Sequence, residues 1–157
     1  MGYQGLVITV ALAGALPQGG FNPVEFFRGT THGEGILKVI FQSPEKITVD
    51  SEGTQLSDGT LVLKQTIHQP GTATRIRYWR LRQSAPNHFE GTLTDAAGPV
   101  SVDESGNSVR ISYRAKNHLY FDQTLTPAGD KAVQNRTKIS RFGIIVAHFN
   151  EAIRKRS

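Results

Sequence analysis

The sequence contains no cysteine among its 157 residues. Disulfides, thiolate metal sites, cysteine nucleophiles and lipid attachment to a cysteine are therefore excluded within it. The absence of cysteine does not indicate the cellular compartment, because a protein without disulfides can fold on either side of a membrane. The absence of cysteine limits the chemistry of the chain rather than its location.

The common catalytic motifs are missing as well. The chain has no Gly-x-Ser-x-Gly elbow, no Gly-x-Gly-x-x-Gly fingerprint and no phosphate-binding P-loop. Its five histidines are dispersed, with no His-x-His or His-x-x-x-His pair to place two imidazoles on one metal ion. Motifs therefore predict no catalytic residue, no metal ligand and no cofactor. A metal or haem site built by His68 and His118 from separate strands is the alternative.

A long hydrophobic run is also lacking. The most apolar stretch, Leu6–Leu16, is shorter than the ~20 residues that span a bilayer. It has the length of a signal-peptide core, and Ala13 and Ala15 follow the Ala-x-Ala pattern of a cleavage site. We therefore expect an exported, periplasmic protein. The alternative is a cytoplasmic protein in which residues 5–12 form an apolar strand.

Positive charge is in moderate excess. The 18 Lys and Arg residues outnumber the 13 Asp and Glu residues, which gives a net charge of +5. An anionic membrane surface is therefore a candidate partner, and a nucleic acid is a weaker one. The aromatic residues disfavour nucleic acid, because Tyr78, Trp79, Tyr113 and Tyr120 fall within predicted strands and not on an exposed basic groove. The sequence gives no oligomeric state.

The chain divides into an N-terminal apolar segment, residues 1–20, and a single domain, residues 21–157. In the domain, short apolar stretches alternate with turn-forming residues every 8 to 12 residues or so, which is typical of an all-β sandwich or barrel. The alternation is clearest at Val109–Ala115. Strands are predicted at 35–41, 46–50, 60–68, 73–82, 88–95, 99–103, 109–115, 118–126 and 138–149.

Short loops between these strands favour an antiparallel up-and-down meander, and about eight strands close into a barrel without exposed edges. Residues 22–27 resemble one helical turn, with Asn22 as the cap and Pro23 as the first helical residue. The tail, residues 151–157, is expected to be helical or frayed.

The segment 73–82 departs from simple alternation. Tyr78 and Trp79 have opposite parity although both are large and apolar, so we expect a bulge near Tyr78. The same segment carries the densest basic cluster of the chain, formed by Arg75, Arg77, Arg80 and Arg82. These arginines either form an outer solvated face or place one or two guanidinium groups inside the barrel, opposite an acidic head group.

Three segments resemble the signature stretches of a bacterial family of uncharacterised lipocalin-like proteins, many of them predicted to be exported or lipoproteins. The segments are Tyr78–Leu81, Phe89–Asp95 and Asn135–Gly143. The similarity extends from about Pro23 to about Arg154. It implies a calycin-type barrel, and it carries over no catalytic residue.

We therefore predict a non-catalytic barrel that binds an apolar or amphiphilic, anionic lipid-like ligand. The predicted ligand-binding residues are Trp79, Arg80, Tyr113, Phe121, Arg136 and Phe142. Asn135, Arg136 and Phe142 are expected to have a structural role first, with Phe142 in the core and Gly143 allowing close backbone approach or a bend. The alternative is a small isomerase or cyclase, whose general acid would be a buried carboxyl without an arginine partner. Candidates for that acid are Glu34, Glu90, Asp95 and Asp122.

Overall fold

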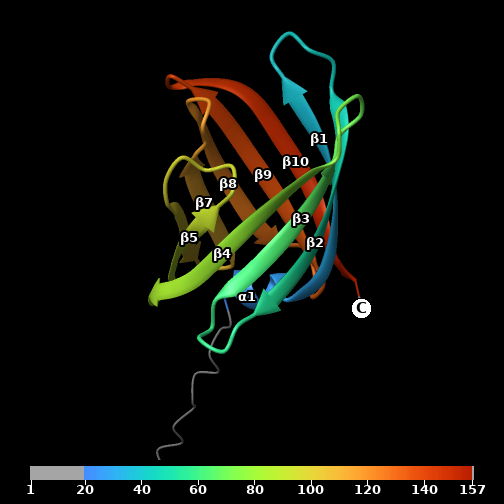
Figure 1. The fold of residues 1–157 in the computed structure, drawn as a ribbon. Coiled ribbons are helices and arrows are strands. Elements are labelled where there is room, and N and C mark those ends of the chain that lie inside the picture. Colours follow the sequence, from blue (N-terminus) through green and yellow to red (C-terminus); the bar gives the residue numbers. More distant parts are fainter. Residues whose placement is uncertain (1–19, 157) are drawn as a thin grey trace, which may run out of the picture.

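The computed structural model describes residues 20–156, which form a closed antiparallel β-barrel with one short helix (Figure 1). The elements are α1 (Pro23–Phe27), β1 (Gly29–Val39), β2 (Glu45–Gln55), β3 (Leu61–His68), β4 (Arg75–Ala85), β5 (His88–Leu93), β6 (Val100–Ser105), β7 (Ser108–Arg114), β8 (Leu119–Pro127), β9 (Ala132–Arg141) and β10 (Ile144–Arg156). The predicted up-and-down barrel is confirmed, with ten strands in place of about eight.

Every strand pairs with its neighbours in sequence, and β1 closes the ring by pairing with β10. This last pairing runs from Thr30 opposite Arg156 to Val39 opposite Ala147. Closure leaves no strand with an unpaired edge in the ring, so no exposed row of backbone groups invites another chain.

Helix α1 covers one end of the barrel (Figure 1). Asn22 caps it, with its side-chain oxygen accepting from the backbone N–H of Val24 at 2.9 Å, and Pro23 occupies the first turn. Its apolar side chains Val24, Phe26 and Phe27 are buried in the main core cluster. The predicted helical turn is therefore confirmed, and it closes this end of the barrel.

Two expectations for the C-terminal third are wrong. The segment 138–149 is not one strand, because it is divided between β9 and β10 by a tight turn at Phe142 and Gly143. Both turn residues have a positive φ, 51° and 80°, as in the hairpin turns that match strand twist. The tail is neither helical nor frayed: β10 continues to Arg156 and provides the closing pairing with β1.

Strand β4 alternates without the bulge expected near Tyr78. Trp79 and Leu81 face the interior, whereas Ile76 and Tyr78 lie on the outer face, where they are 48% and 49% exposed. The register of β4 against β5 shifts only near its end, between Gln83 and Ala85. The strand therefore stays regular near Tyr78, and the two large apolar side chains of Ile76 and Tyr78 are exposed on its outer face.

Among residues 20–156, no helix is long and apolar enough to cross a bilayer. The Leu6–Leu16 run on which the export prediction rests lies outside the described residues. Export therefore stays a prediction.

Candidate ligand cavity

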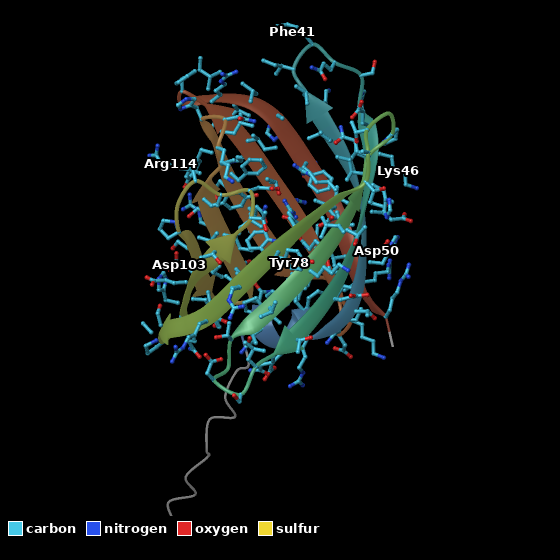
Figure 2. All side chains as sticks on the ribbon, viewed as in Figure 1. Phe41, Lys46, Asp50, Tyr78, Asp103 and Arg114 are labelled. Atoms are coloured by element: carbon cyan, nitrogen blue, oxygen red, sulfur yellow. The ribbon has the colours of Figure 1, made fainter. Side chains whose placement is uncertain are left out.

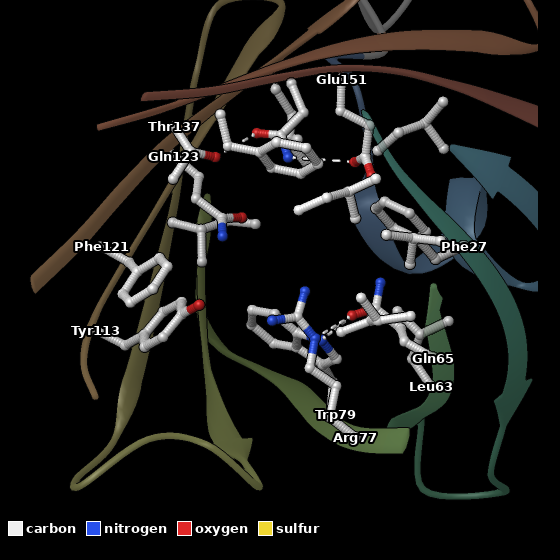
Figure 3. A pocket seen from close by; sticks show the side chains of 18 of the residues that line it. Phe27, Leu63, Gln65, Arg77, Trp79, Tyr113, Phe121, Gln123, Thr137 and Glu151 are labelled. Atoms are coloured by element: carbon white, nitrogen blue, oxygen red, sulfur yellow. Dashed lines mark hydrogen bonds between the residues drawn. The ribbon is translucent and has the colours of Figure 1, made fainter. Parts of the chain in front are cut away.

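A cavity of about 200 Å³ lies inside the barrel. It extends from Pro23 and Phe27 of α1 to Gln69 and Arg75 near the opposite end. Most of its wall is apolar, and polar side chains form a band across its middle (Figure 3). The cavity is therefore suited to a molecule with an apolar body and a polar group.

Three aromatic rings form one side of the cavity. Tyr113 and Phe121 stack with their ring centres 4.8 Å apart, and the Trp79 ring meets Tyr113 edge-on at 5.7 Å (Figure 3). Burial raises the pKa of the Tyr113 hydroxyl, and the nearby charge of Arg77 opposes that rise. Tyr113 therefore stays a neutral hydroxyl that can donate a hydrogen bond in the cavity.

Gln65 of β3 organises the polar band. Its side-chain oxygen accepts from Arg77 Nε at 2.7 Å and from Trp79 Nε1 at 2.6 Å. Its amide nitrogen donates to Ser51 Oγ at 3.2 Å. These three bonds fix the orientation of Gln65, and through it the guanidinium group of Arg77.

Arg77 brings a positive charge into the cavity wall. Its side chain is only 16% exposed, and its nearest carboxylate is Asp95, whose Oδ2 lies 3.9 Å from Nη1. Asp95 also pairs with Arg75, at 3.5 Å. Because the bond to Gln65 uses Nε and the ion pair is long, the outer nitrogens of Arg77 can still bind a carboxylate or a phosphate.

Glu151 of β10 is a buried carboxyl on another part of the wall (Figure 3). Its Oε1 accepts from Asn135 Nδ2 at 3.3 Å, and Thr137 Oγ1 in turn donates to Asn135 Oδ1 at 3.2 Å. Burial raises the pKa of Glu151, against opposing effects of the Asn135 hydrogen bond and of the charges on Arg77 and His32. No ion pair to Glu151 is present in residues 20–156.

Glycine on the inner face of β1 makes room for these side chains. A Cβ atom at Gly33 would lie 2.7 Å from Glu151 Oε2, and one at Gly35 would overlap the Phe149 ring. Both glycines therefore allow β10 side chains to extend across β1 into the interior.

The structure separates the six predicted ligand-binding residues into two groups. Trp79, Tyr113 and Phe121 line the cavity. Arg80, Arg136 and Phe142 do not line it, and this part of the prediction needs correction. Arg80 and Arg136 sit at outward positions of β4 and β9, and Phe142 is 76% exposed in the β9–β10 turn.

The alternative with one or two arginines of the basic cluster inside the barrel agrees with the lining, which includes Arg75 and Arg77, but the other polar cavity residues were missed. Arg77 takes the inward place expected of Arg80, and Glu151 is the buried carboxyl in place of the four acidic candidates, none of which lines the cavity. A signal for Arg77 was present, because residues two apart on a strand share a face and Arg77 lies two positions before Trp79.

The described residues contain no group of three or more histidines and carboxylates placed to hold a metal ion. His68 lies 3.9 Å from Asp50, whereas the His118 ring stacks on Phe142 with the centres 5.7 Å apart. The two histidines therefore have separate surroundings, which gives no support to the alternative metal or haem site.

Comparison with known proteins places the fold and the family. No curated protein matches the sequence. An S-type phycobiliprotein lyase, CPES from Guillardia theta, superposes with a TM-score of 0.66 at 8% identity, over 85% of this chain and 91% of that one. A protein of unknown function of the DUF3598 family from Nostoc punctiforme gives 0.65 at 11% identity, over 87% of this chain, which spans half of that protein. At such identities the likeness shows the fold alone, a lipocalin-like barrel. Residues 15–155 match the model of a family described as protein of unknown function, DUF3833, and the chain belongs to that family.

Proposed function

We propose that the barrel binds a small amphiphilic molecule without transforming it, with the apolar part in the cavity and an anionic head group on Arg77. The observation that carries the proposal is the placement of Arg77 in a mostly apolar cavity, with its outer nitrogens beside the Tyr113 hydroxyl and 3.9 Å from the carboxylate of Asp95. The aromatic side formed by Trp79, Tyr113 and Phe121 offers apolar area, with the Tyr113 hydroxyl as a polar group.

The size of the cavity limits the ligand. An apolar cavity of ~150 Å³ takes up benzene, so the 200 Å³ found here can hold a somewhat larger apolar group. A medium-chain carboxylic acid fits this volume. Typical ligand pockets are larger, at about 300 to 1,000 Å³, so a long-chain lipid would leave part of its chain outside the barrel.

Binding of octanoate and octanol, followed by calorimetry and by Trp79 fluorescence, tests the proposal. Arg77→Met keeps the unbranched apolar stem of the side chain and removes its charged end. We expect this variant to weaken octanoate binding by about 2 kcal/mol, or roughly thirtyfold, and to change octanol binding little. The matched control is Arg80→Met, which removes an outward arginine from the same strand. Equal loss in both variants, or no binding by the wild type, would contradict the proposal.

The fold likeness to a phycobiliprotein lyase makes a linear tetrapyrrole a useful second compound. Its four rings exceed a 200 Å³ cavity, so we expect no binding inside the barrel. Tight tetrapyrrole binding that depends on Trp79 would favour a larger, opened cavity and a different ligand class.

Glu151 favours a second candidate, an acid–base enzyme of the isomerase type. A buried carboxyl with a raised pKa and no ion pair in the described residues is suited to proton transfer within an apolar cavity. Native mass spectrometry of the protein from its own host should identify a co-purifying compound. Conversion of that compound by the wild type, but not by Glu151→Gln, would support the enzyme, whereas recovery of the compound unchanged supports the binding protein.

A further inference from the structure

The end of the barrel opposite α1 carries a group of exposed apolar side chains. We call Ile40, Phe41, Phe142, Ile144 and Ile145 the rim patch; all five are exposed. They come from the β1–β2 loop, the β9–β10 turn and the start of β10, which lie at the same end (Figure 1). The two segments are joined where the backbone N–H of Ile40 donates to the carbonyl of Val146 at 3.0 Å.

Phe142 contacts the His118 ring and the Arg141 guanidinium group, but it and the other rim residues stay exposed and are not packed in the core. Phe41 is fully exposed at the loop tip (Figure 2), and Phe142 is 76% exposed. Both adopt left-handed backbone, with φ of 61° and 51°, where asparagine or glycine is preferred and a bulky side chain is unfavourable. Exposed phenylalanines in strained positions indicate a contact with something outside the chain.

The rim patch is surrounded by positive charge. The same end of the barrel carries Lys38, Arg114, Lys116 and Arg141, and no ion pair to any of them occurs within residues 20–156. The acidic side chains at this end are already engaged: Glu45 accepts from Gln69 Nε2 at 2.6 Å, and Asp95 pairs with Arg75 at 3.5 Å. An apolar tip with a basic surround complements the boundary between acyl chains and anionic head groups.

We propose that the rim patch docks on the surface of an anionic phospholipid bilayer. A second copy of the chain fits less well, because two basic rims would repel each other. A nucleic acid also fits less well, because Ile40, Ile144 and Ile145 offer no ring on which a base could stack. The cavity extends toward this same end, to Gln69 and Arg75. Docking does not require an occupied cavity, so it goes beyond the proposed function.

Co-sedimentation of the full chain with vesicles of phosphatidylglycerol and phosphatidylcholine tests docking. The wild type is expected to bind these vesicles, to bind pure phosphatidylcholine less, and to dissociate as salt is added. Phe41→Asn with Phe142→Asn should lower the affinity at least about tenfold. The thermal midpoint of this double variant should be unchanged or higher, because asparagine tolerates the left-handed backbone.

Two matched controls locate the effect. Ile76→Thr with Tyr78→Thr removes exposed apolar side chains from the barrel side, and it should leave vesicle binding unchanged. Lys116→Gln with Arg141→Gln should weaken binding, whereas Lys131→Gln with Arg154→Gln, near the α1 end, should not. Failure of the wild type to bind, equal loss in a control, or a reversible dimer or oligonucleotide complex that requires Phe41 would overturn the proposal.

Discussion

Glu151 is an acidic side chain held inside the barrel by one hydrogen bond from Asn135. Burial of the Glu151 side chain disfavours its ionised form and raises its pKa. The folded protein therefore keeps a proton on this carboxyl at pH values where the unfolded chain has lost it. The residue therefore makes the stability of the whole barrel depend on pH, whatever its role toward a ligand.

The sign of this dependence follows from the direction of the shift. The pKa of Glu151 is raised from 4.5, so above 4.5 and up to the raised value the folded state binds more protons than the unfolded state. The free energy of unfolding contributed by this group then falls as pH rises through that window.

Glu151→Gln removes the titration and keeps the shape and the bond from Asn135. We expect the variant to gain stability relative to the wild type as pH rises above 4.5, because the wild type loses the contribution of its buried carboxyl over that range. Urea denaturation followed by Trp79 fluorescence across this range measures the difference. A variant that is less stable than the wild type at neutral pH would show instead that the carboxylate is ionised and partnered.

At the scale of elements, helix α1 depends on a close approach to β2. A Cβ atom at Gly53 would overlap the backbone carbonyl of Phe27 and lie 3.3 Å from the Cα of Arg28. These backbone atoms cannot shift to relieve the overlap, whereas the end of a flexible side chain could. Gly53 is therefore required for the helix to cover its end of the barrel.

Gly53→Ala should push α1 away from the barrel and lower the free energy of unfolding by about 1 to 3 kcal/mol. Gly98→Ala is the matched control, because a Cβ there meets no atom within 4 Å and no positive φ is present. It should leave stability unchanged. Thermal unfolding of both variants by circular dichroism makes the comparison. If the two behave alike, α1 is not held against β2 as described.

The sequence predicted the strands that have clear alternation and turn residues, and it missed those that lack them. β7 was located closely because Val109, Ile111 and Tyr113 alternate with polar residues. The first half of β1 was missed because Gly33 and Gly35 are weak strand formers, although here they admit the side chains of β10. The β9–β10 turn was missed because Phe142 is apolar and gives no sign of a left-handed, exposed position.

The candidate site was predicted mainly in its apolar part. Trp79, Tyr113 and Phe121 could be found because large apolar side chains are expected inside a barrel. Arg77 and Glu151 could not be assigned from hydrophobicity, since polar residues are expected outside unless they are paired. The inward direction of Arg77 follows from its parity with Trp79, whereas that of Glu151 follows from β10, which was not predicted from the sequence as a strand beyond residue 149.

At the scale of the whole molecule, the barrel depends on the closing pairing between its first and last strands. The C-terminal half of β10 pairs with β1 on one side and with β9 on the other. It also provides Glu151 and Ile153 to the interior. Loss of this segment would leave two unpaired strand edges and open the core on one side.

A chain ending at Asn150 is therefore expected to lose the compact monomer rather than a frayed tail. Without Glu151–Arg156, strands β1 and β9 keep unpaired backbone groups that favour pairing with other chains, so the truncated protein should aggregate on expression or elute as large oligomers. Ala152→Ser with Arg154→Gln in the complete chain is the control, because it changes outward side chains and keeps the backbone pairing. Size-exclusion chromatography with amide exchange distinguishes the outcomes. A truncated monomer with native protection in β1 would show that closure by β10 is not needed for the fold.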